Sequence, residues 1–209
     1  MPLSQFDGIA YINLKRRPER KKGLLKELAL LDTDELKVHR IEAIDDSFNG
    51  IKGCLLSHIK ALEFIDKQGW KKGLILEDDA QFIDDPPLIK KEIAHFFSEA
   101  RENWDVYLLG GWYWRSISAP WERLLQIKYS RRAHAYCVNR HYLPKVHRLF
   151  QEGYEATKPH LFYKQSRMFA TDILWEELQF HHRWYAPVIP LVFQREAFSD
   201  IEHCEKKVR

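Results

Sequence analysis

The stretch Leu74-Ile-Leu-Glu-Asp-Asp-Ala80 carries most of the fold prediction, because an apolar run ends there in three consecutive carboxylates. Such a run is typical of a buried parallel strand, and α/β proteins place their chemistry at the carboxyl ends of parallel strands. Glu77, Asp78 and Asp79 would repel one another unless a positive charge lay among them, and divalent cations take oxygen ligands of this kind. A cation could also neutralise a diphosphate, so the stretch indicates an enzyme for a nucleotide-linked substrate. The alternative is a solvated acidic turn.

Strand-like and helix-like patterns alternate before this stretch. Residues 9–14 and 38–44 have the apolar pattern of strands. Apolar residues recur at helical spacing after Pro18 and again after Gly53. The order strand, helix, strand, helix, strand predicts an α/β fold, with a mostly parallel central sheet and flanking helices.

The C-terminal half has weaker patterns. An irregular loop is predicted at residues 112–120. Pro190 argues against a central strand at residues 188–193, so an edge strand or an extended loop is predicted there. Thr171 is predicted to cap a short helix, and the tail from about residue 199 is polar. The other expected elements are helices at 88–100 and 143–150 and strands at 106–109 and 133–138.

Composition limits the class of protein. The 209 residues are 45% hydrophobic and 30% charged, which suits one globular domain spanning residues 1–209. A net charge of +3 is too small to indicate nucleic-acid binding. Cys54, Cys137 and Cys204 are far apart, which favours a reducing compartment over a disulfide framework. There is no signal-peptide pattern and no apolar run of the ~18 residues that span a bilayer, so we expect a cytoplasmic protein.

Further motifs accompany the acidic stretch in a fixed order. They are Asn13-Leu14-x-Arg16-Arg17-Pro18-x-Arg20, Gly53-Cys54-Leu-Leu-Ser57-His58, His134-Ala135-Tyr136 with Asn139-Arg140, and Gln194 with Ser199-Asp200-Ile201. Together with Glu77-Asp78-Asp79, this set resembles glycosyltransferase family 25, the group of lipooligosaccharide transferases and collagen β-galactosyltransferases. The likeness runs from about residue 9 to about residue 202, and residues 112–132 lie outside it.

The resemblance implies a GT-A-like fold, a UDP-sugar donor, a divalent cation (Mn²⁺ or Mg²⁺) and inverting transfer of a hexose, with galactose expected. The acidic stretch stands where such transferases carry a DxD motif, although its first residue here is Glu. On this basis Glu77 and Asp79 are predicted metal ligands, and Asp78 is a predicted donor contact. The implied acceptor is a glycan or glycolipid such as lipooligosaccharide. A short, mildly basic chain without a secretion signal fits a bacterial enzyme that reaches this acceptor at the inner face of the cytoplasmic membrane by peripheral association; a viral or other cytosolic enzyme is the alternative.

Inverting transfer also needs a base that deprotonates the acceptor hydroxyl. Asp172 is the predicted base, at an expected helix start where relatives also carry an acid, and Asp200 is its rival. The alternative for Asp172 is helix capping. For Asp200 it is capping or an ordering role in the core.

Other predicted contacts come from the remaining motifs. Arginine can grip a phosphate with two bonds, and cations at a helix N-terminus ordinarily need an explanation. For the arginines predicted to contact the donor, the alternative is a basic helix start that faces water. For His58, it is a hydrogen-bonded histidine packed in the protein. The predicted donor contacts are Asn13, Arg16, Arg17, Arg20, Ser57 and His58. The predicted acceptor platform is Trp112 and Trp114, with Tyr113. His134 is predicted to face the cleft like His58, His203 is a predicted metal ligand near the C-terminus, and His181 and His182 are expected at the surface.

Two other classes of function stay open at this point. One is a non-catalytic carbohydrate- or nucleotide-binding module on the same fold. The other is a metal-dependent phosphatase or nuclease, which would normally require more carboxylates around two metal ions.

Overall fold

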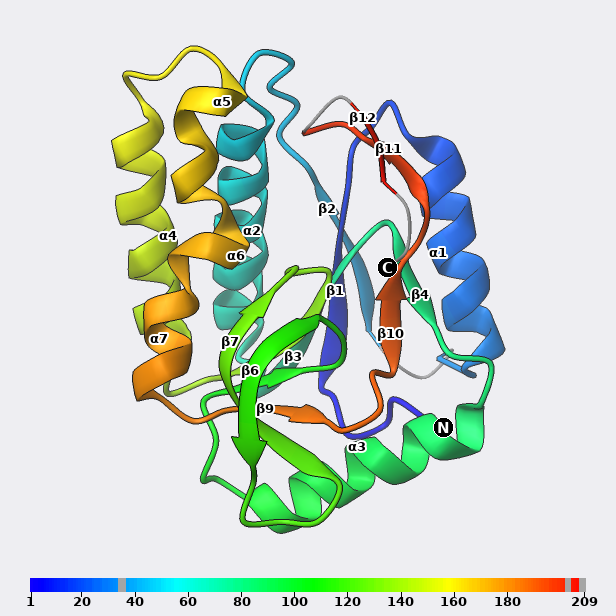
Figure 1. Cartoon of the computed structure of the whole chain (residues 1–209). Coiled ribbons are helices and arrows are strands. Elements are labelled where there is room, and N and C mark those ends of the chain that lie inside the picture. The colour runs from blue at the N-terminus through cyan, green and yellow to red at the C-terminus, as the bar shows by residue number, and fades with distance from the viewer. Residues whose placement is uncertain (34–36, 202–203, 207–209) are drawn as a thin grey trace.

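A computed structural model describes residues 1–33, 37–201 and 204–206 (Figure 1). The helices are α1 (Pro18–Leu30), α2 (Gly50–Gln68), α3 (Pro86–Ala100), α4 (Leu143–Thr157), α5 (Tyr163–Ser166), η1 (Arg167–Phe169), α6 (Thr171–Leu174) and α7 (Glu176–His181). The strands are β1 (Gly8–Asn13), β2 (Val38–Glu42), β3 (Lys72–Glu77), β4 (Ala80–Phe82), β5 (Val106–Leu108), β6 (Trp112–Ser118), β7 (Leu124–Arg131), β8 (Ala135–Asn139), β9 (Trp184–Pro187), β10 (Val192–Gln194), β11 (Ala197–Ser199) and β12 (Cys204–Lys206).

The main sheet has eight strands in the described chain, in the order β2-β1-β3-β8-β5-β9-β7-β6. β1 runs parallel to β2 and β3, as the alternation of strands and helices predicts. β8 then lies antiparallel between β3 and β5, and β7 and β6 extend the far edge as an antiparallel hairpin. The predicted α/β fold with flanking helices is confirmed, and the antiparallel strands come from its C-terminal half.

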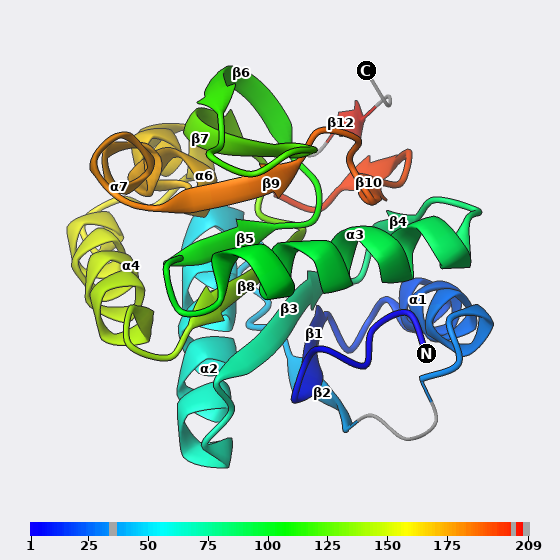
Figure 2. The ribbon, with the colours of Figure 1, turned by 90° about the horizontal axis from the view of Figure 1, so that it is seen from below.

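The apolar run before the carboxylates is continuous because β3 is covered on both faces. Leu74 and Leu76 pack with the side chains of α1 and α3, whereas Ile75 packs with those of α2 and α4. Figure 2 shows α1 and α3 on one side of the sheet and α2 and α4 on the other. Leu74, Ile75 and Leu76 are each 0% exposed, so burial on both faces explains why this strand lacks alternation.

Local signals at helix ends agree with the structure at several points. α1 begins at Pro18, as predicted, since proline suits the first turn of a helix. α3 begins after Asp85, whose carboxylate accepts from the backbone N–H of Leu88 at 2.9 Å. α2 ends at Gln68 and is followed by Gly69, which has a φ of +71°. None of the described helices combines the length and apolar character that crossing a bilayer requires.

Some local predictions are wrong. Residues 112–120 contain β6 and not only a loop, because pairing with β7 organises a strand whose other edge has no neighbour in the described sheet. Thr171 does not cap its helix: Ala170 is the cap, Thr171 is the first helical residue, and its side chain makes no capping bond. The tail from residue 199, for which the sequence indicated only polar character, contributes β12, which pairs with β11.

Candidate active site

A pocket lies where the carboxyl ends of β1 and β3 meet the first turns of α2. Asn13 ends β1 and Glu77 ends β3, so the parallel pairing of these strands brings the first motif and the acidic motif to one edge. Ligands of open α/β sheets bind at this kind of edge. Of the predicted site residues, Asn13, Arg16, Arg20, Ser57, His58, Glu77, Asp78, Asp79 and Asp200 line the pocket. Arg17, Trp112, Trp114 and Asp172 lie outside its lining.

Asp79 carries the least satisfied carboxylate of the acidic motif. Its Oδ2 accepts a hydrogen bond from Gln194 Nε2 at 3.0 Å, but its buried Oδ1 has no hydrogen-bond partner among the described residues. Burial, followed by the nearby charges of Glu77 and Asp78, raises the pKa of Asp79 to about 7. An unsatisfied buried oxygen next to two other carboxylates is the environment that a hard divalent cation would relieve. The residues present therefore fit such a cation.

Asp78 is held by the segment that follows β1. It is 7% exposed; Asn13 Nδ2 donates to its Oδ2 at 2.8 Å, and Arg20 donates to its Oδ1 at 3.2 Å. Burial raises the pKa of Asp78, and the bonds from Asn13 and Arg20 offset part of that rise. Arg40 in turn donates to Asn13 Oδ1 at 3.0 Å. Both Asp78 oxygens are engaged, so this carboxylate ties β1, α1 and β3 together at the pocket floor.

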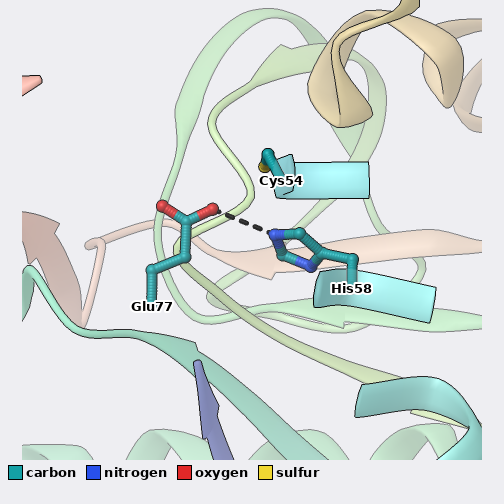
Figure 3. Close-up of side chains that lie close together, drawn as sticks. All are labelled: Cys54, His58 and Glu77. Atoms are coloured by element: carbon teal, nitrogen blue, oxygen red, sulfur yellow. Dashed lines mark hydrogen bonds and ion pairs between the residues drawn. The ribbon is translucent and has the colours of Figure 1, made fainter. Parts of the chain in front are cut away.

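The Glu77 side chain points toward α2. Its Oε1 lies 3.1 Å from His58 Nε2 (Figure 3). The other ring nitrogen of His58 lies 2.8 Å from the Tyr136 hydroxyl. Cys54 precedes His58 by one helical turn on α2. Glu77 and Asp79 therefore share the edge of β3 but contact different neighbours.

The predicted phosphate-binding arginines converge on Asp200. Arg16 and Arg17 reach its Oδ1 at 2.7 and 2.6 Å, and Arg20 lies 3.7 Å from its Oδ2. Burial would raise the pKa of Asp200, but the hydrogen bonds from Arg17 and Arg16 outweigh it and hold that pKa below its ordinary value. This carboxylate joins three arginines of the first motif, and its predicted catalytic role stays a prediction.

Ser57 and Asp172 occupy different surroundings. Ser57 Oγ donates to the carbonyl of Gly53 at 2.6 Å and accepts from the backbone N–H of Ile44 at 2.9 Å, so it connects α2 to the loop after β2. Asp172 Oδ2 accepts from the backbone N–H of Arg132 at 2.9 Å. The hydroxyl of Thr171, the residue before Asp172, lies 3.9 Å from the sulfur of Cys54, which lines the pocket, whereas Asp172 itself is outside the lining.

The two predicted platform tryptophans stand on β6 with exposed rings. Trp112 and Trp114 are 44% and 51% exposed, and their rings meet edge to face at 4.7 Å. Arg131 lies over the Trp114 ring and Arg132 over the Trp112 ring. The hydroxyl of Tyr113, between them, is buried in the protein. Tyr113 therefore packs against the core and does not share the exposure of the two tryptophans.

The remaining histidines separate into distinct environments. His134 is 1% exposed; its Nε2 lies 3.2 Å from the Val192 carbonyl oxygen, and its backbone carbonyl accepts from Glu77 N–H at 2.8 Å. Burial lowers the pKa of His134. His181 is exposed and His182 half-buried near Lys145. His203 lies outside the described residues.

Four residues of the site were not assigned a role from the sequence. Gln194, Cys54 and Tyr136 stand inside the quoted motifs, so the motif positions themselves were the available signal. Arg40 had no signal, because its bond to Asn13 depends on the pairing of β2 with β1. Each of these roles rests on contacts between residues that are distant in the chain.

The fold and the pocket define an α/β domain with a carboxylate motif and an arginine cluster at one sheet edge. The chain is 28% identical over 142 residues to a protein of Drosophila pseudoobscura pseudoobscura named glycosyltransferase 25 family member, in a match that covers 56% of this chain and 22% of that protein. It is 26% identical over 129 residues to procollagen galactosyltransferase 2 of Mus musculus, covering 50% and 21%. The predicted resemblance to glycosyltransferase family 25 is therefore confirmed over about half the chain. The chain spans about a fifth of the length of these relatives. No family model matches it.

The fold comparison covers more of the chain. A crystal structure from Thermus thermophilus, described as a mannose-1-phosphate geranyltransferase, is similar with a TM-score of 0.50. The match covers 87% of this chain and 73% of that one at 10% sequence identity. This likeness concerns the fold alone, and the predicted GT-A-like fold class is confirmed.

Proposed function

We propose that this chain is a cation-dependent glycosyltransferase that transfers a hexose, namely galactose, from a UDP-sugar to a glycan acceptor. The proposed transfer inverts the configuration at the anomeric carbon. The observation that carries the proposal is the unsatisfied buried oxygen of Asp79, in a pocket that arginines also line. The relatives named above support the transferase class. In this proposal residues 1–209 form the single catalytic domain.

The donor would lie along the ends of β1 and β3. Asp79 and Glu77 would hold Mn²⁺ or Mg²⁺, whose chemistry is to neutralise the charge that develops on the departing diphosphate. Arg16 and Arg20 line the pocket and would contact phosphate oxygens, which requires them to share their present carboxylate partners.

The other donor residues have supporting roles. Asn13 and Asp78 shape the pocket floor through their mutual bond. Arg17 orders Asp200 through the bond from its Nε. Ser57 holds the loop after β2, which forms one wall of the pocket, through its bond to the backbone N–H of Ile44. His58 orients Glu77.

The acceptor would approach from the hairpin of β6 and β7. The exposed faces of Trp112 and Trp114 suit the apolar faces of sugar rings. Arg132 is two residues from His134, whose carbonyl binds the backbone of Glu77, so this platform adjoins the edge that carries the acidic motif. Asp172, bonded to the backbone of Arg132, would accept the proton of the acceptor hydroxyl.

We expect Trp114→Ala to raise the KM for the glycan acceptor by about fivefold, because a lost stacking contact costs on the order of 1 kcal/mol. Affinity for UDP should not change, since Trp114 does not line the donor pocket. Steady-state kinetics with varied acceptor measure the first quantity, and calorimetry with UDP the second. An unchanged acceptor KM would remove β6 from the acceptor site. Ile117→Ala, at an exposed position further along β6, is the matched control.

The acceptor proposed here is a lipid-linked oligosaccharide such as lipooligosaccharide, which places the reaction at the inner face of the cytoplasmic membrane with peripheral association. The support is the resemblance stated above and the exposed tryptophans beside cationic side chains. Sedimentation of the protein with anionic vesicles, with and without the acceptor, tests the association. Recovery in the supernatant in both cases would remove the membrane from the proposal.

Thermal unfolding with UDP and Mn²⁺, added singly and together, tests the proposed function. We expect the pair to raise the Tm more than the sum of the two single additions, because cation and diphosphate complete one another's coordination. Manganese-dependent release of UDP from UDP-galactose should follow. Stabilisation by a glycan alone, with no response to UDP and Mn²⁺, would instead support a non-catalytic carbohydrate-binding module.

A further inference from the structure

Cys54, His58 and Glu77 form a cluster with the composition of a metal site. Among the described residues, one ligand atom from each of the three lies within 4.8 Å of the others (Figure 3). Cys54 and His58 stand one turn apart on α2, and Glu77 faces them from the end of β3. We propose that these side chains bind Zn²⁺, at a site that shares Glu77 with the proposed transferase cation but takes its other two ligands from α2.

The surroundings of His58 orient it as metal-binding histidines are oriented. The ring is 1% exposed, and its Nδ1 lies 2.8 Å from the hydroxyl of Tyr136, a residue that is itself 0% exposed. Metal-binding histidines usually direct one nitrogen to the ion and the other to an oxygen partner that fixes the ring. With an ion bound, a proton on Nδ1 donated to the Tyr136 hydroxyl would leave Nε2 as the metal-facing nitrogen, and Nε2 lies 3.1 Å from Glu77 Oε1.

The donor atoms select the kind of ion. A thiolate is a soft ligand and an imidazole a borderline one, so the cluster favours Zn²⁺ over the hard Mn²⁺ and Mg²⁺. Binding removes the thiol proton of Cys54 to solvent, and the sulfur, the imidazole nitrogen and one carboxylate oxygen supply three ligands. All three residues line the pocket, so the fourth position of a tetrahedral ion would face the pocket.

Glu77 belongs both to this cluster and to the acidic motif. Zn²⁺ bound to Cys54 and His58 would occupy a carboxylate that the proposed transferase uses for its own cation. A competitive effect of Zn²⁺ on transfer rests on the proposed function, whereas Zn²⁺ binding does not. The experiment below measures binding alone, so its failure would leave the transferase proposal standing.

The test uses the reduced full chain with Zn²⁺ and, as a spectroscopic substitute, Co²⁺. We expect one Zn²⁺ per chain by calorimetry, and a thiolate-to-cobalt charge-transfer band with Co²⁺. Cys54→Ser should remove the band and weaken Zn²⁺ binding by at least about 100-fold, since outer partners of a metal already contribute about 10- to 100-fold. His58→Gln should also weaken Zn²⁺ binding, with a cobalt band reduced in intensity.

Cys137→Ala is the matched control, because it removes a thiol that is 0% exposed within β8. It should keep both the band and the Zn²⁺ affinity. Serine is nearly isosteric with cysteine, so the metal-free Cys54→Ser variant should have the same Tm as the metal-free wild type. Equal Tm values would show that weaker Zn²⁺ binding by this variant comes from the lost ligand and not from misfolding. A wild-type protein without a cobalt–thiolate band, or an unchanged Zn²⁺ affinity in a folded Cys54→Ser variant, would overturn the site.

Discussion

Asp79→Asn is expected to abolish cation-dependent transfer, with a fall in kcat of at least about 100-fold. Asparagine keeps the size of the side chain and an oxygen that can accept from Gln194, but it cannot supply the charge that holds a divalent ion. The measurement is UDP release from UDP-galactose across a range of Mn²⁺ concentrations, with acceptor present. Higher Mn²⁺ should not restore the rate if Asp79 is a direct ligand.

Asp84→Asn is the matched control for this substitution, because Asp84 is an exposed acid a few residues further along the same segment. It should keep wild-type turnover and Mn²⁺ dependence. Near-normal turnover by a well-folded Asp79→Asn variant would contradict the proposed role of the acidic motif.

The same variant also reports on the folded state without metal. The pKa of Asp79 is raised to about 7 from an ordinary value of 3.8, so the fold favours the protonated form. Its contribution to stability is therefore fully present below its ordinary pKa and is lost as the pH rises through about 7. Asparagine resembles the protonated acid, so this loss should be absent from the variant.

Thermal unfolding in a chelating buffer from about pH 5 to about pH 8 measures that difference. We expect the Tm of Asp79→Asn to exceed that of the wild type at the upper end of the range and to approach it at the lower end. A variant that is less stable than the wild type at the upper end would show that the charge of Asp79 is already satisfied within the protein.

The location of the site could be predicted from the sequence because it depends on one strand. Leu74, Ile75 and Leu76 form an uninterrupted apolar run. In a chain where strand and helix patterns alternate, such a run predicts a strand that is covered on both faces. The carboxylates that follow must then emerge at the edge where chemistry is placed. The same alternation predicts that Asn13, at the end of a parallel neighbour, reaches this edge.

The partners of each carboxylate could not be predicted in the same way. Asp78 bonds to Asn13 across 65 positions of the chain, and Asp79 to Gln194 across 115. These pairs depend on strand register and on how the last segment returns over the pocket. Neither leaves a local pattern, because a one-residue change in register would give each carboxylate a different neighbour.

The strand β6 escaped prediction for a related reason. Trp112, Trp114 and Ile117 are all exposed on an edge strand, so the segment lacks the alternation of buried and exposed residues that identifies a strand. Its β-forming aromatic residues were the available signal, and its pairing with β7 decides its conformation. Residue type alone singled out the two exposed tryptophans, and their part in acceptor binding stays a prediction.

Asp172→Asn is expected to lower kcat by about 10² to 10⁴-fold while leaving the affinity for UDP and Mn²⁺ close to that of the wild type, which is the effect of losing a general base. Asparagine can still accept from the backbone N–H of Arg132 through its amide oxygen, so the start of α6 should keep its position. Steady-state kinetics give the loss of turnover, and calorimetry with UDP and Mn²⁺ gives the affinity. A parallel loss of UDP and Mn²⁺ binding would instead assign Asp172 to the donor site.

Asp200→Asn separates the two candidate bases. Asp200 contacts Arg16 and Arg17 within 2.7 Å, and its lowered pKa makes it a weak proton acceptor. Losing its charge should release the arginines, so we expect weaker UDP binding and a lower Tm, with a smaller loss of kcat than in Asp172→Asn. The pH dependence of kcat discriminates further, since removing the base should eliminate the acidic limb of the profile. If Asp200→Asn eliminates that limb while Asp172→Asn retains it, the base is Asp200 and the arginine cluster must open during turnover.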